Sequence, residues 1–218
     1  MKKAFTLAEV LVTLGIIGVV SAMTVPTLMQ NYQRKSYVTQ LHKFYTELSQ
    51  ALIQYQTDRN AINVQEAGLN SQASAYNFLK SYFKIISDCG ADKTPCFATD
   101  YKKVNGTSIN INSAPPKNIV TLASGQTVGI SYSGASYLFE LLVDINGQSG
   151  PNIQGRDLFE LFVYQDGTID DYSAEKVTVP LSSDTREARF ADGCNGGGAT
   201  NYHGCFGKLL NDNWEMTY

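Results

Sequence analysis

The N-terminal part of the chain is dominated by one long apolar run. Between Glu9 and Arg34 no residue is charged, and residues 10–25 are almost entirely apolar. A membrane-spanning helix needs about 20 such residues, so this run is long enough to cross a bilayer. A secretory signal peptide is the alternative, but its apolar core is typically about 7–15 residues long and ends at a small-residue cleavage site. The length of the run favours a membrane anchor.

After Lys35 the apolar positions continue at helical spacing, and polar residues occupy the positions between them. This pattern predicts an amphipathic helix that packs on a globular head along one side. The repeat is too short for a coiled coil, which is the alternative. We therefore expect a single helix from about residue 6 to residue 57. The stripe consists of Val38, Leu41, Tyr45, Leu48, Leu52 and Tyr55.

The remaining residues predict a short helix and several strands. Residues 58–70 read as a connection, and apolar residues at helical spacing indicate a second helix over 71–87. From Val104 onward the pattern changes to short apolar runs separated by turns, with Ser124-Gly125 as a hairpin signal. A long helix followed by an antiparallel sheet is an α+β fold. The expected strands lie around 109–111 and at 119–122, 127–130, 137–145, 158–165 and 207–210.

Composition narrows the function further. The chain has 218 residues with 43% hydrophobic and 17% charged residues, and its net charge is −3. These values exclude a disordered tail, and the net negative charge does not indicate a surface that binds nucleic acid. Because the sequence also contains no recognisable constellation of nucleophile, base and acid, we expect neither a catalytic residue nor an enzyme.

The start of the chain carries a family resemblance. Residues 2–17 read KKAFTLAEVLVTLGII, which combines a short basic leader, a small residue, Phe-Thr-Leu, a Glu and a long apolar helix. This segment resembles the leader and helix start of the type IV pilin and type II secretion pseudopilin superfamily. The resemblance implies a pilin-like α+β fold and a membrane-embedded prepilin peptidase that cuts between Ala4 and Phe5 and methylates the new amino terminus. Ala4 stands where the family usually has Gly, and because Ala is also small we expect cleavage.

The same resemblance assigns roles to two residues of the helix. Glu9 would pair with the amino terminus of Phe5 on a neighbouring subunit, since an unpaired carboxylate in a bilayer is costly. The alternative for Glu9 is an unpaired position near the membrane interface. Pro26 resembles the helix-kinking proline of pilins. The expected organisation is a leader (1–4), a transmembrane and assembly helix (5–35), its amphipathic continuation (36–57) and a head (58–218).

These features together predict a structural subunit of a type IV pilus or a type II secretion pseudopilus. Its expected location is the bacterial inner membrane, with a single-pass helix and the head in the periplasm or outside, followed by the assembled fibre. The expected partners are other pilin-like subunits, the prepilin peptidase and the assembly platform, with no nucleic acid. The alternative is a membrane-anchored periplasmic module that binds a ligand or calcium and does not polymerise.

Four cysteines form two local groups in the head, Cys89 with Cys96 and Cys194 with Cys205. For a head outside the cytoplasm, local disulfides are the natural interpretation. A zinc site made from all four thiolates is the alternative, but neither pair has the two-to-four-residue gap that is typical of structural zinc. We favour disulfides, paired by their proximity in the sequence.

One loop of the head is rich in oxygen-bearing side chains. Asp144, Asn146, Asn152 and Asp157 are candidate calcium ligands, because calcium takes about 6–8 oxygen atoms. Some pseudopilins of secretion systems carry calcium in a head loop. The spacing does not match an EF-hand, however, and Asn, Asp and Gly also form ordinary turns. We favour the turn and keep calcium as the only candidate cofactor.

Overall fold

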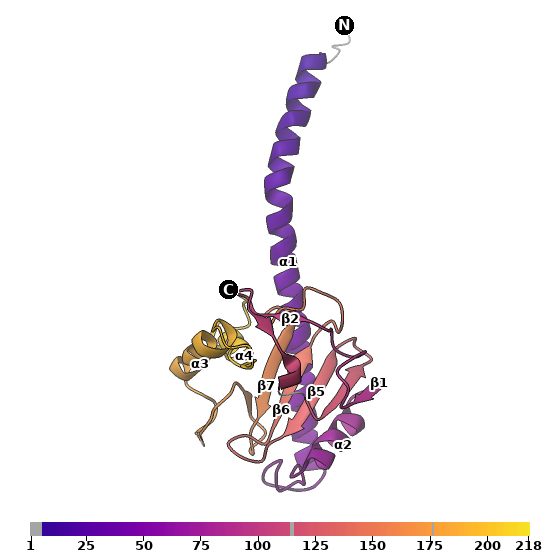
Figure 1. Ribbon diagram of the computed structural model, residues 1–218, viewed down its shortest axis with the longest axis vertical. Coiled ribbons are helices and arrows are strands. Elements are labelled where there is room, and N and C mark those ends of the chain that lie inside the picture. The colour runs from indigo at the N-terminus through magenta and orange to yellow at the C-terminus, as the bar shows by residue number, and fades with distance from the viewer. Residues whose placement is uncertain (1–5, 114–115, 176) are drawn as a thin grey trace. The chain divides into compact units, whose positions relative to one another are not determined.

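The computed structural model describes residues 6–113, 116–175 and 177–218, and it is an α+β structure (Figure 1). A long helix, α1 (Leu7–Thr57), is followed by an antiparallel sheet with six strands. The chain divides into two compact units, Met1–Ser36 and Tyr37–Tyr218. The first unit contains the N-terminal part of α1. The second contains the rest of α1 and the whole head.

All neighbouring strands of the large sheet are antiparallel, and their order is β1-β4-β5-β6-β7-β8. The turn between β4 and β5 contains Gly125, whose φ of +91° suits glycine. A separate two-stranded ladder consists of β2 (Tyr101–Lys102) and β3 (Ser108–Ile109). The six strands are β1 (Ile85–Gly90), β4 (Asn118–Leu122), β5 (Thr127–Tyr132), β6 (Phe139–Asp144), β7 (Leu158–Val163) and β8 (Ile169–Asp170).

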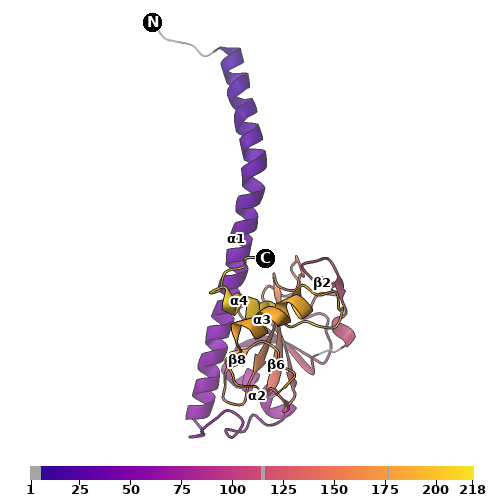
Figure 2. The same ribbon diagram turned by 90° about the vertical axis from the view of Figure 1, so that its left-hand side faces the viewer.

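Both faces of this sheet are covered. Residues 37–57 of α1 lie along one face, where fully buried Leu41 and Leu48 belong to the same core as Leu141 of β6 (Figure 2). Leu142, the next residue of β6, belongs to a second core on the opposite face, together with Phe97. Successive side chains of a strand point to opposite faces, so a sheet covered on both sides needs apolar residues at consecutive positions.

The second helix is shorter than the sequence pattern predicts. Helix α2 (Gln72–Tyr82) begins at a capping box formed by Ser71 and Ser74. It ends because Phe83 takes an extended conformation (φ −121°, ψ 144°). The expected helix over 71–87 is therefore wrong at its C-terminal end, where residues 85–90 form β1 and pair with β4.

The predicted strand at 207–210 is also wrong. These residues belong to helix α4 (Cys205–Asn211), which follows α3 (Ser183–Arg189) and a π-helical turn (Phe190–Cys194). Cys205, Phe206 and Leu209 are its buried apolar residues, and they share one face at helical spacing. The N-cap is Gly204 at φ +94°, where an added Cβ would lie 2.1 Å from the Arg189 carbonyl oxygen. Glycine is required there by both conformation and space.

Candidate assembly segment and head loop

The N-terminal part of α1 presents apolar side chains on all sides. Every residue from 6 to 33 is exposed in the chain, including Leu11, Ile16 and Val20. The helix is long and apolar enough to cross a membrane. An apolar surface of this size is unstable in water and marks a membrane or interaction site. This part of the helix therefore suits a membrane anchor.

Threonine hydroxyls within this segment are satisfied by the helix itself. The Thr13 hydroxyl donates to the carbonyl oxygens of Glu9 and Val10, both at 2.9 Å. Thr24 Oγ1 lies 2.9 Å from the Val20 carbonyl oxygen, and Thr27 donates in the same way to the Met23 carbonyl. An unsatisfied hydroxyl would be costly in hydrocarbon. These bonds let three polar residues sit in an otherwise apolar helix.

Glu9 is held within its own chain at the start of α1. The Glu9 carboxylate accepts hydrogen bonds from the backbone N–H and the hydroxyl of Thr6, both at 2.8 Å, and the Glu9 N–H donates to Thr6 Oγ1 at 3.3 Å. This is a reciprocal capping box. We did not predict this role for Thr6, although Thr-x-x-Glu before an apolar run is its sequence signal. The expected processing residues Ala4 and Phe5 lie outside the described residues.

Pro26 lies inside α1, and the helix continues on both sides of it. Because proline has no N–H, the ordinary helical hydrogen bond from residue 26 to the Ala22 carbonyl is missing. That carbonyl lies in the middle of the apolar segment. The position agrees with the resemblance in residue type, while its role in assembly stays a prediction.

The four cysteines form two disulfides in the head. Cys89 is bonded to Cys96, and Cys194 is bonded to Cys205. The first bridge joins the edge strand β1 to the segment before β2. The second joins the π-helical turn to the start of α4, and both of its cysteines are fully buried.

In the loop between β6 and β7, the carboxylates accept hydrogen bonds from other groups of the same chain. Asp144 accepts hydrogen bonds from the Tyr101 hydroxyl and, at 3.1 Å, from the Asn146 N–H. Asp157 accepts the N–H groups of Asn152 and Ile153, both at 2.6 Å. Both aspartates are fully buried. The four carboxylate oxygens thus fix the backbone of the loop and one tyrosine.

The loop leaves few oxygen atoms for a cation. The side-chain oxygens of Asn146 and Asn152 are buried and accept no hydrogen bond from the described residues. These two neutral oxygens are far fewer than the 6–8 that calcium takes, unless the carboxylates give up their N–H and O–H donors. Within the described part of the chain, no group of three His, Cys, Asp or Glu side chains is placed to hold a metal ion. The geometry favours the turn interpretation.

Burial also changes the titration of this loop. It raises the pKa of Asp144 to about 7, and the nearby Asp157 carboxylate adds to the shift. Burial likewise raises the pKa of Asp157, although the N–H groups of Ile153 and Asn152 oppose the change. Near neutral pH the loop therefore holds fewer negative charges than its composition implies.

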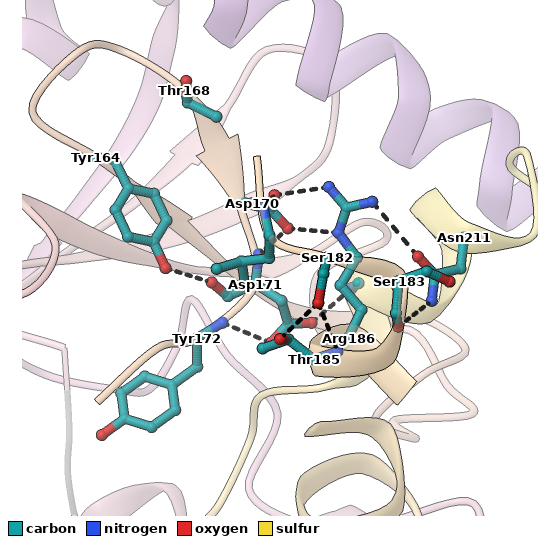
Figure 3. Close-up of polar contacts among 12 residues, drawn as sticks. Tyr164, Thr168, Asp170, Asp171, Tyr172, Ser182, Ser183, Thr185, Arg186 and Asn211 are labelled. Carbon is teal, nitrogen blue, oxygen red and sulfur yellow. Dashed lines mark hydrogen bonds and ion pairs between the residues drawn. The ribbon is translucent and has the colours of Figure 1, made fainter. Parts of the chain in front are cut away.

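Two consecutive aspartates after β7 hold the C-terminal helices on the head. Asp170 forms a bidentate ion pair with Arg186 of α3, at 2.7 and 2.9 Å (Figure 3). Asp171 accepts the N–H groups of Gly204 and Gly207 at 2.8 and 2.5 Å, so its carboxylate lies at the N-terminus of α4. A carboxylate is favourable at that end of a helix. Neither residue was predicted from the sequence, because both contacts join distant segments.

The comparison with known families identifies the first part of the chain. Residues 1–25 match the model of the prokaryotic N-terminal methylation motif, which is the prepilin-type signal of type IV pilins and pseudopilins. This motif supports a type IV pilin-like precursor, and in this chain it is followed by a head that contains two disulfides. The motif points to a structural subunit. No curated protein and no solved structure matches the chain.

Proposed function

We propose that this protein is a structural subunit of a type IV pilus or a type II secretion pseudopilus. It waits in the bacterial inner membrane with its head on the periplasmic side and enters the fibre through the N-terminal part of α1. The observation that carries this proposal is the methylation motif at residues 1–25, which overlaps the first part of a helix whose N-terminal half is apolar on all sides. Such a surface needs lipid before assembly and neighbouring helices afterwards.

In this proposal, Glu9 draws a new subunit into register. Removal of residues 1–4 by the prepilin peptidase creates a positively charged amino group on Phe5. A neighbouring subunit offers the Glu9 carboxylate, and pairing removes the desolvation cost that each charge bears alone in an apolar bundle. The Thr6 capping box supports this scheme, because its two donors reduce that cost while the subunit waits for its neighbour.

The proposal is tested on fibres sheared from the native bacterium. Mass spectrometry of wild-type fibres should find a chain that begins at N-methylated Phe5. Glu9→Gln removes the charge while keeping the shape, and we expect cleaved, membrane-resident protein with about tenfold fewer fibres or fewer still. Glu47→Gln is the matched control, because Glu47 lies half-buried on the second half of α1 and, among the described residues, forms an ion pair with Lys43 alone.

Three outcomes would overturn the proposal. One is a chain that still begins at Met1 in the membrane, which would fit an anchored periplasmic module. Another is normal fibre yield from the Glu9→Gln variant. A chain cut within or after the apolar run would also exclude fibre assembly, since the helix would be lost.

A further inference from the structure

A pocket of about 470 Å³ opens on the head, on the sheet face opposite α1. Its floor comes from β6 and β7, and its walls come from the segments after β8 and before α4. The side chains that matter for the argument are Tyr137, Glu140, Glu160, Phe162, Tyr172 and Arg189. Neither the methylation motif nor the assembly helix accounts for this pocket.

Aromatic rings form one continuous wall. The ring centroids of Tyr137 and Phe162 are 4.8 Å apart, and those of Phe162 and Tyr172 are 5.4 Å apart. His203 stacks on Tyr172 at 4.8 Å, and burial lowers the pKa of His203 to about 4, so this ring is neutral. The faces of such rings attract cations, and the attraction grows when the site is partly desolvated.

Two carboxylates share the pocket. Glu160 lies opposite Leu142 in the ladder and Glu140 lies opposite Phe162, so the two glutamates are diagonal neighbours on one face of the sheet. Glu140 accepts a hydrogen bond from the Tyr137 hydroxyl at 2.8 Å. No residue in the described part of the chain forms a hydrogen bond or an ion pair with Glu160. Burial raises the pKa of Glu160, and repulsion from Glu140 adds to the shift.

The charges of the lining do not balance. Asp192 also borders the pocket, and Arg189 is the cation that the lining supplies. The Arg189 guanidinium lies over the Tyr172 ring, 5.3 Å from its centroid. Glu160 is half-buried, and a partly desolvated carboxylate without a partner is costly. The site thus offers an aromatic wall and an unpaired carboxylate to a positively charged ligand.

We propose that this pocket binds an organic ammonium group, carried either by a small amine or by a lysine side chain of another protein. The ammonium lies between Glu140 and Glu160 and relieves their repulsion, while its alkyl stem packs on Phe162 and Tyr172. This site goes beyond the assembly role and does not depend on it.

Calorimetric titration of the full chain in a nonionic detergent tests the proposal. The probes are n-butylammonium chloride, which represents a free amine, and Nα-acetyl-lysine methylamide, which represents a lysine side chain. The neutral n-butanol and sodium chloride at equal ionic strength are the controls. We expect saturable binding of at least one ammonium probe, and the tighter probe identifies the source of the ligand.

Two variants assign binding to this pocket. Glu160→Gln keeps the size and shape of the side chain and removes the half-buried ionisable carboxyl group, so the fold should persist while affinity falls by about tenfold or more. Glu215→Gln, an exposed glutamate outside the pocket, makes the same charge change and should bind like wild type. Should Glu160→Gln fail to fold, Tyr172→Leu keeps an apolar wall without the π face and should weaken binding several-fold.

Three results would overturn the proposal. They are no saturable binding of either ammonium probe, equal affinity in the folded Glu160→Gln variant, and n-butanol binding as tightly as n-butylammonium. The last result would define an apolar pocket without charge recognition.

Discussion

At the N-terminus of α1, the side chain of Thr6 has two functions. Its hydroxyl accepts the Glu9 N–H and also donates to the Glu9 carboxylate. The first bond satisfies a helix N–H that has no partner inside the helix, and the second partly compensates a charge in an apolar segment. The Thr6 side chain thus links the start of α1 to Glu9, the candidate assembly residue.

Replacing Thr6 with Val should fray the first turn of α1. Valine keeps the β-branched shape but cannot accept the Glu9 N–H, and loss of a cap of this kind costs about 1 kcal/mol. Amide exchange at residues 7–10 should therefore be about fivefold faster, measured by mass spectrometry on the full chain in micelles. Thr13→Val is the matched control, because the Thr13 hydroxyl bonds only to backbone carbonyls. Equal exchange in the two variants would contradict the capping role.

Asp144 couples the stability of the head to pH. Its pKa in the folded state is about 7, well above the ordinary value near 3.9. Between these two values the folded state binds a proton that the unfolded state has already released. The contribution of Asp144 to the free energy of unfolding is therefore largest below about pH 4, and it is lost as the pH rises toward 7.

The Asp144→Asn variant should remove this contribution. In urea unfolding, the wild-type free energy of unfolding should fall between pH 5 and pH 8 relative to the variant, by at most about 1.4 kcal/mol per pH unit. His203 titrates in the opposite sense but is present in both proteins, so it cancels in the comparison. Asp100→Asn, at an exposed position, is the control. Parallel pH profiles for wild type and Asp144→Asn would contradict the assignment.

At the scale of elements, helix α4 depends on a residue from a distant segment. Its N-terminal N–H groups are satisfied by Asp171, which is fully buried and precedes the helix by more than thirty residues. Seven residues are too few for a stable isolated helix, so packing and this cap must supply its stability.

The Asp171→Ala variant should release α4. It removes the acceptor of three N–H groups, those of Tyr172, Gly204 and Gly207. Leaving buried donors without a partner costs about 1–3 kcal/mol each, so we expect the free energy of unfolding to fall by about 3 kcal/mol or more. Asp100→Ala is the control, since Asp100 is exposed and, among the described residues, accepts a hydrogen bond from the Thr99 hydroxyl alone. A change below about 0.5 kcal/mol would show that α4 does not need this cap.

The same helix shows where sequence patterns stop being informative. Residues 207–210 are too few to distinguish a strand from a helix by their pattern, and the cap that stabilises the helix lies elsewhere in the chain. Where the signal is long or local, the prediction agrees with the structure. The stripe from Val38 to Tyr55 lies in α1, and Ser124-Gly125 forms a hairpin turn.

Among the polar features of the head, those that depend on nearby residues were predictable from the sequence, and those that depend on distant residues were not. Pairing cysteines by proximity gives the two disulfides of the structure, because each closes a short loop. The environment of Asp144 was not predictable, since its tyrosine partner lies 43 residues away. The oxygen-rich loop is visible in the sequence, but which of its oxygens accept hydrogen bonds depends on contacts within the folded chain.

At the scale of the molecule, the two units depend on different surroundings. Met1–Ser36 contains the apolar segment that needs lipid or neighbouring helices, whereas Tyr37–Tyr218 contains both hydrophobic cores and both disulfides. The stability of the second unit is therefore a property of its own packing. A ligand that binds its folded state raises that stability, which makes global unfolding a sensitive test for a metal.

Calcium should leave the stability of the head unchanged. A site that binds only the folded state adds about 2.7 kcal/mol at a hundredfold excess over its dissociation constant, and removal of the ion reverses the gain. Because the carboxylates of Asp144 and Asp157 already accept N–H and O–H donors, we expect the same unfolding midpoint in calcium and in EDTA. Magnesium at equal ionic strength controls for screening. A midpoint that rises with calcium but not with magnesium, and that loses this response in Asp157→Asn, would establish the loop as a calcium site.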